Sequence, residues 1–203
     1  KLNVNVSLRK YTTFKLGGNA DFFIDCSNIL ELQEIIKFSE KERFPIFLLG
    51  AGSNTLVKDG GIRAIVVRLK GDFETIRVND NKIYCGAGVN LQKLVDAAVK
   101  NSLSGLEFLA GIPGTVGGAI YMNAGIKEKE IKDVLSKVQV LSENCEVKAM
   151  NKEDIKFSYR ESEFKSSRSI IIFAEFELRK ANQEDIKREI SLLLKKREET
   201  QPA

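Results

Sequence analysis

Two glycine-rich stretches contain the residues best suited to chemistry. The first, Gly50 to Thr55, reads Gly-Ala-Gly-Ser-Asn-Thr, and the second, Gly111 to Gly125, holds five glycines and a proline within fifteen residues. Glycine loses much backbone entropy on folding, so such a density usually means that the backbone must come close to something or take a positive φ. Unshielded N–H groups suit a phosphate. Two such stretches in one chain therefore predict a dinucleotide held between them.

The first stretch matches neither of two common nucleotide-binding motifs. It lacks the third glycine of the dinucleotide-binding fingerprint, and residues 58–61 predict a turn where that motif requires a helix. It also lacks the Gly-Lys-Ser/Thr ending of a P-loop. What remains is a nest of N–H groups and small polar side chains that suits a pyrophosphate, although a tight turn between strands explains it equally well. The candidate cofactor-binding residues here are Gly50, Ala51, Gly52, Ser53, Asn54 and Thr55.

The second stretch favours a functional loop over a structural one. Its glycine spacing would let the backbone lie flat against a bulky planar group, Pro113 stiffens the turn, and Asn123 can hydrogen-bond to the edge of a ring. The candidate cofactor-binding residues are Gly111, Pro113, Gly114, Thr115, Gly117, Gly118, Asn123 and Gly125. A third glycine turn, at residues 86–88, is interpreted as structural because it follows a hairpin strand and precedes a capped helix.

A polar cluster at residues 157–164 is the third candidate. If this segment is extended, Tyr159, Glu161 and Glu163 face one way, and Arg160 and Ser162 the other. An arginine beside a phenol suits a carboxylate or phosphate through bidentate contact. On its own, however, the segment favours an exposed strand with scattered charges.

The periodicity of the remaining sequence predicts an α+β protein in two lobes, residues 1–70 and 71–203. Strands are predicted at residues 20–26, 45–49, 64–69, 75–78, 82–85, 134–141, 146–150 and 169–178. Helices are predicted after Asn28, with Glu31 completing a capping box, after Asn90 and after Asn182. The inward face of the last helix is predicted to be Ile186, Ile190, Leu193 and Leu194.

Composition excludes several classes of protein. Hydrophobic residues make up 43% of the 203 residues and charged residues 30%, which is typical of a globular fold. The net charge of +4 is mild and dispersed, so no nucleic-acid-binding surface is indicated, and no apolar run predicts membrane insertion. There is no histidine, which removes Ser-His-Asp catalysis, histidine metal sites and a histidyl-linked flavin. Three widely spaced cysteines predict no zinc site and fit a reducing cytoplasm.

Four motifs, in order along the chain, resemble the family of UDP-N-acetylenolpyruvoylglucosamine reductases, flavoenzymes of peptidoglycan precursor synthesis in the cell wall. They are Thr12-Thr13-Phe14-Lys15-Leu16-Gly17-Gly18, the loop from Leu49 to Leu56, the stretch from Gly111 to Gly125, and Tyr159-Arg160-x-Ser162-x-Phe164. Each motif alone is weak evidence for the resemblance. The four together are specific for the family, and the resemblance covers essentially the whole chain.

The resemblance implies a two-lobed FAD-binding fold of the vanillyl-alcohol-oxidase/p-cresol-methylhydroxylase type. Non-covalent FAD would place its pyrophosphate on Gly50 to Thr55 and its isoalloxazine near Gly111 to Gly125. In that family NADPH reduces the flavin, and a hydride then passes to C3 of the enolpyruvyl group of the UDP-sugar substrate, giving UDP-N-acetylmuramate. By resemblance, Arg160 would stabilise the charge that forms at C2, and Tyr159 would contact the substrate. A monomer is expected.

The chain also departs from the family. Members carry a serine proton donor within Gly-Ser-x-Phe-Lys, and a later glutamate, both in a third, substrate-binding domain, and neither is found here. We therefore expect an incomplete enzyme that binds FAD but turns over its substrate poorly or not at all. Two alternatives stay open: another FAD-dependent oxidase or dehydrogenase of the same fold, and a non-catalytic flavin-binding module.

Overall fold

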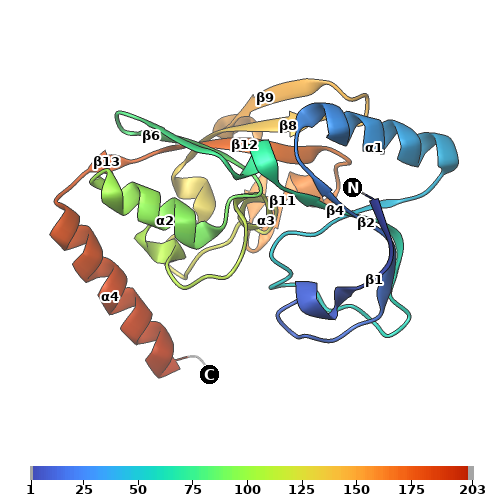
Figure 1. The fold of residues 1–203 in the computed structure, drawn as a ribbon. Coiled ribbons are helices and arrows are strands. Elements are labelled where there is room, and N and C mark those ends of the chain that lie inside the picture. Colours follow the sequence, from blue (N-terminus) through green and yellow to red (C-terminus); the bar gives the residue numbers. More distant parts are fainter. Residues whose placement is uncertain (1, 201–203) are drawn as a thin grey trace.

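Two β-sheets carry the fold in the computed structural model, which describes residues 2–200 (Figure 1). The first sheet has the strand order β1-β2-β4-β3, and the second has the order β5-β6-β12-β8-β9. The strands of the first sheet are β1 (Leu2–Ser7), β2 (Asn19–Cys26), β3 (Ile46–Leu48) and β4 (Ile62–Leu69). Those of the second are β5 (Ile76–Asn79), β6 (Lys82–Gly86), β8 (Leu135–Leu141), β9 (Val147–Asn151) and β12 (Ile170–Glu177). Together with the helices, they form the expected α+β architecture.

The first sheet is built around a β-α-β unit. Helix α1 (Ile29–Glu42) connects β2 to β3, and both strands pair with β4 in parallel, while β1 pairs with β2 antiparallel. The side chain of Asn28 accepts a hydrogen bond from the Glu31 N–H at 2.9 Å, which confirms the predicted cap. The Glu31 carboxylate in turn accepts the N–H of Ser27 at 2.6 Å, one residue earlier than a capping box requires.

The second sheet is antiparallel throughout, where a mixed or antiparallel sheet was expected. Helix α2 (Leu91–Lys100) begins at Asn90, whose side chain accepts the N–H of Gln92 at 2.9 Å. Its buried face consists of Leu91, Leu94, Val95 and Ala98. Short strands β7 (Leu103–Ser104) and β13 (Arg179–Lys180) pair with each other beside this helix, and β10 (Phe157–Ser158) pairs with β11 (Glu161–Ser162).

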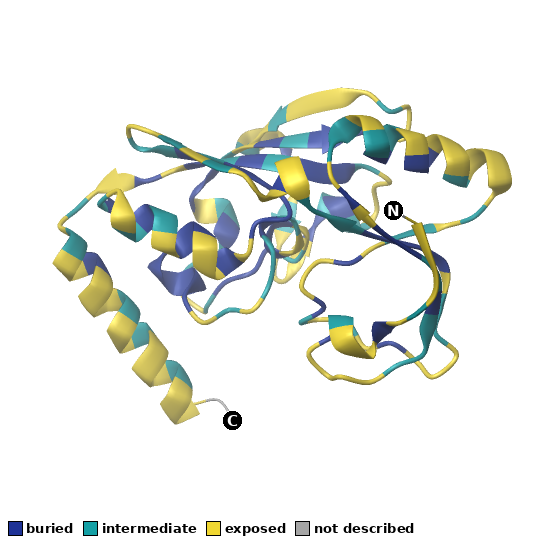
Figure 2. Cartoon of the chain, viewed as in Figure 1, coloured by how far each residue is buried: buried dark blue, intermediate teal, exposed yellow. Residues whose placement is uncertain are grey.

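Helix α1 packs against strands of both sheets. Its buried residues Leu32 and Ile36 share one hydrophobic cluster with Val67 of the first sheet and with Leu141 and Ile172 of the second. Burial of the facing sides of these elements is visible in Figure 2. The two sheets therefore pack together through a shared part of the core.

The C-terminal helix α4 (Gln183–Thr200) begins where Asn182 predicts, with the Asn182 side chain accepting the N–H of Glu184 at 2.8 Å. Ile186 is buried as expected, but Leu194, predicted to face inward, is 37% exposed. The reason is visible in Figure 1, where the second half of the helix extends away from the sheets. Leu194 nevertheless faces inward as predicted, because its Cδ2 would lie 2.8 Å from a Cβ on Gly111.

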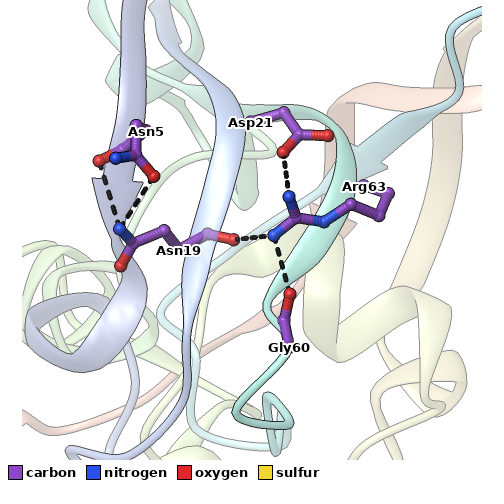
Figure 3. A network of polar contacts seen from close by, with 5 residues as sticks. All are labelled: Asn5, Asn19, Asp21, Gly60 and Arg63. Carbon is purple, nitrogen blue, oxygen red and sulfur yellow. Dashed lines mark hydrogen bonds and ion pairs between the residues drawn. The ribbon is translucent and has the colours of Figure 1, made fainter.

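A polar network fixes the far end of the loop that contains Gly50 to Thr55 (Figure 3). Arg63, at the start of β4, forms an ion pair with Asp21 and donates to the carbonyl of Gly60 at 2.7 Å and to that of Asn19 at 3.2 Å. The Asn19 side chain reaches Asn5 of β1 at 2.8 Å. The turn that closes the loop is thereby tied to the two neighbouring strands.

Candidate functional site

The loop from Gly50 to Thr55 follows β3 and leaves its backbone donors open. Within residues 2–200, none of the six N–H groups of this loop donates a hydrogen bond to a protein acceptor. Gly50, Ala51 and Asn54 are exposed to solvent. Since backbone N–H groups are strong donors, a row of six without partners is an arrangement that an anion can satisfy.

Gly52 shows why this loop needs glycine. Its φ is +67°, and a Cβ there would lie 2.0 Å from the carbonyl oxygen of Tyr11. The Gly52 carbonyl accepts the N–H of Thr13 at 3.1 Å. The Thr12-to-Gly18 motif therefore lies directly against the loop, and any side chain at Gly52 would push the two apart.

The two glycine-rich stretches meet in space, although 60 positions separate them. The Ser53 hydroxyl donates to the Pro113 carbonyl at 2.8 Å. A Cβ on Gly50 would lie 2.8 Å from the Thr115 hydroxyl oxygen. The N–H groups of Gly114 and Thr115 also have no protein acceptor among the described residues. The row of free donors thus continues from one stretch into the other.

The second stretch is partly helical, which the sequence did not predict. Helix α3 (Val116–Tyr121) begins at Thr115, whose hydroxyl accepts the N–H of Gly118 at 3.3 Å. Gly117 has a packing reason, because a Cβ there would lie 2.9 Å from that of Ala87. Gly125 has one too, because its Cβ would lie 2.2 Å from the Lys129 carbonyl oxygen. Close backbone packing therefore accounts for part of the glycine density.

Asn123 is the most unusual polar residue of the site. It is fully buried at 0% exposure and has a φ of +43°. Its Nδ2 donates to the Ser158 carbonyl at 2.9 Å. Its Oδ1 is the one buried side-chain nitrogen or oxygen in residues 2–200 without a hydrogen-bond partner. A buried acceptor left empty is costly, so it marks a place where a ligand donor would fit.

Tyr159 and Arg160 occupy the turn of a hairpin, so the prediction of one extended segment was wrong. Ser158 pairs with Glu161 and Phe157 with Ser162, because Arg160 takes a φ of +56° and reverses the chain. Tyr159 is 82% exposed, and the Arg160 guanidinium lies 5.7 Å from the centre of its ring. Both side chains are thus presented at the tip of the turn rather than on opposite faces of a strand.

Arg197 of α4 is a candidate residue that the sequence reasoning missed. A Cβ on Gly111 would lie 3.8 Å from its Cδ and Nη1. Burial lowers the pKa of Arg197, and the positive charge of Arg160 lowers it further. Neither guanidinium forms an ion pair with a carboxylate in the part of the chain that the structure describes. Two arginines without a counter-charge favour an anion beside them. The sequence gives no motif that connects Arg197 with Gly111 or Arg160, because these residues come together only through the packing of α4.

Large apolar side chains are exposed on the segments next to these loops. They are Phe14 and Leu16 of the Thr12-to-Gly18 motif, Leu56 after the first glycine loop, and Tyr121 at the end of α3, with exposures between 42% and 68%. Exposed apolar side chains around free polar donors are the usual composition of a ligand site. A separate surface hollow, lined by Lys82, Lys137 and Glu175 among others, includes no residue of the glycine-rich stretches.

Other kinds of site find no support among residues 2–200. No group of three or more cysteine, aspartate or glutamate side chains is placed to hold a metal ion. No helix of this part of the chain has the length and apolar character needed to cross a membrane. The candidate site is therefore the region where the two glycine-rich stretches, Asn123 and the Tyr159–Arg160 turn gather.

Comparison with known proteins gives the class and then the family. A model of the FAD-binding domain matches residues 20–151, so the fold and the site define a flavin-binding domain. UDP-N-acetylenolpyruvoylglucosamine reductases from Caldanaerobacter subterraneus and Syntrophomonas wolfei are 40% and 37% identical over 202 residues. A crystal structure of this reductase from Thermus caldophilus matches with a TM-score of 0.85 at 34% identity, covering 100% of this chain and 70% of that one. The chain belongs to the UDP-N-acetylenolpyruvoylglucosamine reductase family.

The match leaves part of the relatives uncovered. All of this chain aligns, but it spans 67% of the Caldanaerobacter relative and 68% of the Syntrophomonas one. More distant structures share the fold alone. Cholesterol oxidase from Brevibacterium sterolicum matches with a TM-score of 0.66 at 13% identity, and a vanillyl-alcohol-oxidase-type flavoprotein from Myceliophthora thermophila with 0.62 at 11%. The predicted fold class is thereby confirmed.

Proposed function

We propose that this chain is the FAD-binding part of a UDP-N-acetylenolpyruvoylglucosamine reductase. The observation that carries the proposal is the row of six free N–H groups from Gly50 to Thr55, joined to the second glycine-rich stretch by the Ser53–Pro113 hydrogen bond. Such a row suits a pyrophosphate, because each oxygen can accept from several fixed donors at once. The residues present therefore fit FAD.

The first loop would hold the pyrophosphate and the second stretch the isoalloxazine ring. The empty Asn123 Oδ1 supports the second assignment, because it can accept from a donor at the ring edge. We assign cofactor contacts to Gly50, Ala51, Gly52, Ser53, Asn54, Thr55, Gly111, Pro113, Gly114, Thr115, Gly117, Gly118, Asn123 and Gly125. Gly117 and Gly125 are the weakest of these, since packing alone explains them.

Arg160 would stabilise negative charge on the substrate. FAD held by these loops and reduced by NADPH would supply the hydride for the enolpyruvyl group of the UDP-sugar. Hydride addition to an enol ether puts negative charge on C2 and the adjoining carboxylate, and a fixed guanidinium stabilises that charge more than the neutral ground state. Tyr159, at the exposed tip of the same turn, would contact the substrate. Arg197 adds a second positive charge nearby.

Three further assignments belong to the same proposal. The two sheets would correspond to two FAD-binding lobes, residues 1–70 and 71–203. The protein would work as a monomer. It would work in a reducing cytoplasm, which is supported by three free thiols, two of them buried, among the described residues.

The test is a titration of the flavin-free chain with FAD, followed by fluorescence and visible absorbance. Stoichiometric quenching of the flavin and a resolved absorbance band are expected, and NADPH should bleach that band. A folded chain that binds no flavin would overturn the proposal. Aerobic oxidation of simple alcohols by the loaded protein would instead assign it to the oxidases of this fold. Flavin that binds but is not reduced by NADPH would indicate a non-catalytic module.

A further inference from the structure

The turn that carries Arg160 cannot hold itself in place. It connects β10 and β11, which are two residues each. An isolated two-stranded hairpin is marginal in water even when its strands are longer. Arg160 also has a left-handed φ of +56°, which a non-glycine residue adopts only when its surroundings require it. Two further contacts stay within the segment: the Glu163 N–H donates to the Lys156 carbonyl at 2.9 Å, and Lys165 Nζ donates to the Arg160 carbonyl at 2.8 Å. Contacts with another part of the chain must therefore fix where the turn lies relative to α3.

Two buried side-chain donors fasten this hairpin to helix α3 and the residues after it. The Asn123 Nδ2 donates to the Ser158 carbonyl at 2.9 Å. The Ser162 hydroxyl donates to the Tyr121 carbonyl at 2.7 Å. Ser158 precedes the Tyr159–Arg160 turn and Ser162 follows it, so the two bonds bracket the turn. Ser162 is 3% exposed and Asn123 0%, so the donor side chain of each bond is shielded from water.

Each of the two bonds has one partner in the second glycine-rich stretch, which is proposed to lie under the flavin ring. Tyr121 ends α3, and Asn123 lies two residues later. The same Asn123 side chain that donates to the hairpin has its Oδ1 empty and buried. Asn123 also has a left-handed φ of +43°, a conformation that asparagine adopts more readily than most residues. These features place one side chain between the candidate ring site and the arginine turn.

We infer that Ser162 and Asn123 are positioning residues for Arg160. Their two hydrogen bonds make the arginine turn and the end of α3 one rigid unit, so that the guanidinium keeps a fixed place relative to the bound cofactor. The inference rests on the proposed function of Arg160 for its catalytic meaning. The fastening itself can be measured without turnover.

The test is limited proteolysis of the full chain after Arg160, with fragments identified by mass. Arg160 is exposed at the turn, so cleavage by a trypsin-type protease reports how often the turn opens. Loss of one buried hydrogen bond should speed cleavage of the Arg160–Glu161 bond about fivefold in Ser162→Ala. Ser162→Thr, which keeps the hydroxyl, should restore the parent rate. Asn123→Asp, which loses the Nδ2 donor, should be cleaved faster like Ser162→Ala.

The matched control is Ser166→Ala. The Ser166 hydroxyl also donates to a carbonyl, that of Glu163 at 3.0 Å, but it is exposed and makes no bond to α3. This variant should be cleaved at the parent rate. Thermal unfolding midpoints, measured in parallel, separate local opening from global unfolding. Unchanged cleavage in folded Ser162→Ala, or equal acceleration in the Ser166 control, would overturn the inference.

FAD titration of the same variants separates the two claims. Ser162→Ala should bind FAD as the parent does, because Ser162 is not among the proposed cofactor contacts. If the parent binds no FAD, the proposed function fails, and the cleavage rates still decide whether the hairpin is fastened. If FAD binds and the cleavage rates do not separate, the inference fails and the proposed function stands.

Discussion

At the scale of single residues, the site depends on backbone positions rather than on reactive side chains. Gly52 is the clearest case, because its φ is positive and a Cβ there would lie only 2.0 Å from the carbonyl oxygen of Tyr11. The chain has no histidine, so its proposed chemistry must come from a bound cofactor and from fixed positive charge. Arg197, which lies beside Gly111, and Arg160, whose charge acts on Arg197, supply such positive charge.

Gly52→Ala should weaken FAD binding by at least about tenfold, because the loop must move away from Tyr11 and the free N–H groups lose their alignment. The strain should also lower the free energy of unfolding by about 1–3 kcal/mol. FAD titration and urea unfolding measure the two effects. Gly60→Ala is the control, since a Cβ there meets nothing within 4 Å. Equal FAD affinity in the two variants would contradict the role given to Gly52.

The two most buried thiols give the protein a pH dependence. Burial raises the pKa of Cys85 from 9.0 to about 12. Burial, and the nearby Glu31 charge, raise the pKa of Cys26 to about 12 as well. In the unfolded chain these thiols ionise near pH 9, so above that pH the unfolded state binds fewer protons than the folded one. The contribution of these two thiols to the free energy of unfolding is therefore fully present below pH 9. It should be lost progressively as the pH rises from 9 to 12.

Urea unfolding at a series of pH values measures this loss. Cys26→Ala and Cys85→Ala should each flatten the decline, because each removes one thiol whose pKa differs between the two states. An unchanged slope in the double variant would show that other groups govern alkaline unfolding.

At the scale of elements, helices and strands with a clear cap or a buried face could be predicted from the sequence. Elements that lack both could not. Asn28 and Asn90 marked the starts of α1 and α2 because their side chains accept the first free N–H groups. Strand β1 was missed because Leu2 and Val4 are 50% and 66% exposed, so no buried face shows in its sequence. Helix α3 was missed because Gly117 and Gly118, poor helix formers, lie inside it.

Part of the candidate site was also predictable, because some of its residues leave a recognisable pattern in the sequence. The glycine stretches were visible because backbone requirements select one residue type. The reversal at Arg160 was not, because a left-handed arginine leaves no signature in residue type. The approach of Arg197 depends on how α4 packs against Gly111, a contact between distant parts of the chain.

Helix α1 should couple the stability of the two sheets. Ile36, 7% exposed, lies in the cluster that both sheets share. Ile36→Ala should lower the free energy of unfolding by about 2–4 kcal/mol, since it removes buried apolar contacts and leaves a cavity. Both sheets should still unfold in one transition. Leu30→Ala, on the exposed face at 73%, is the matched control and should change stability little. A biphasic transition in the parent would argue against a shared core.

At the scale of the whole molecule, the fold serves to bring two distant backbone stretches together. One stretch follows a strand of the first sheet, and the other contains α3 beside the second sheet. The Ser53–Pro113 hydrogen bond joins them directly, and the cluster around α1 fixes the sheets behind them. FAD held across this junction would contact both glycine-rich stretches, so its binding should stabilise the whole molecule against unfolding.

Amide hydrogen–deuterium exchange, followed with and without FAD, tests this account most directly. In the free chain, the amides of residues 50–55 should exchange fast, because they have no protein acceptor. FAD should slow them strongly, together with those of Gly114 and Thr115, while amides in the Lys82, Lys137 and Glu175 hollow stay unchanged. Bound FAD that leaves residues 50–55 exchanging at the free rate would contradict the central claim that this loop holds the pyrophosphate.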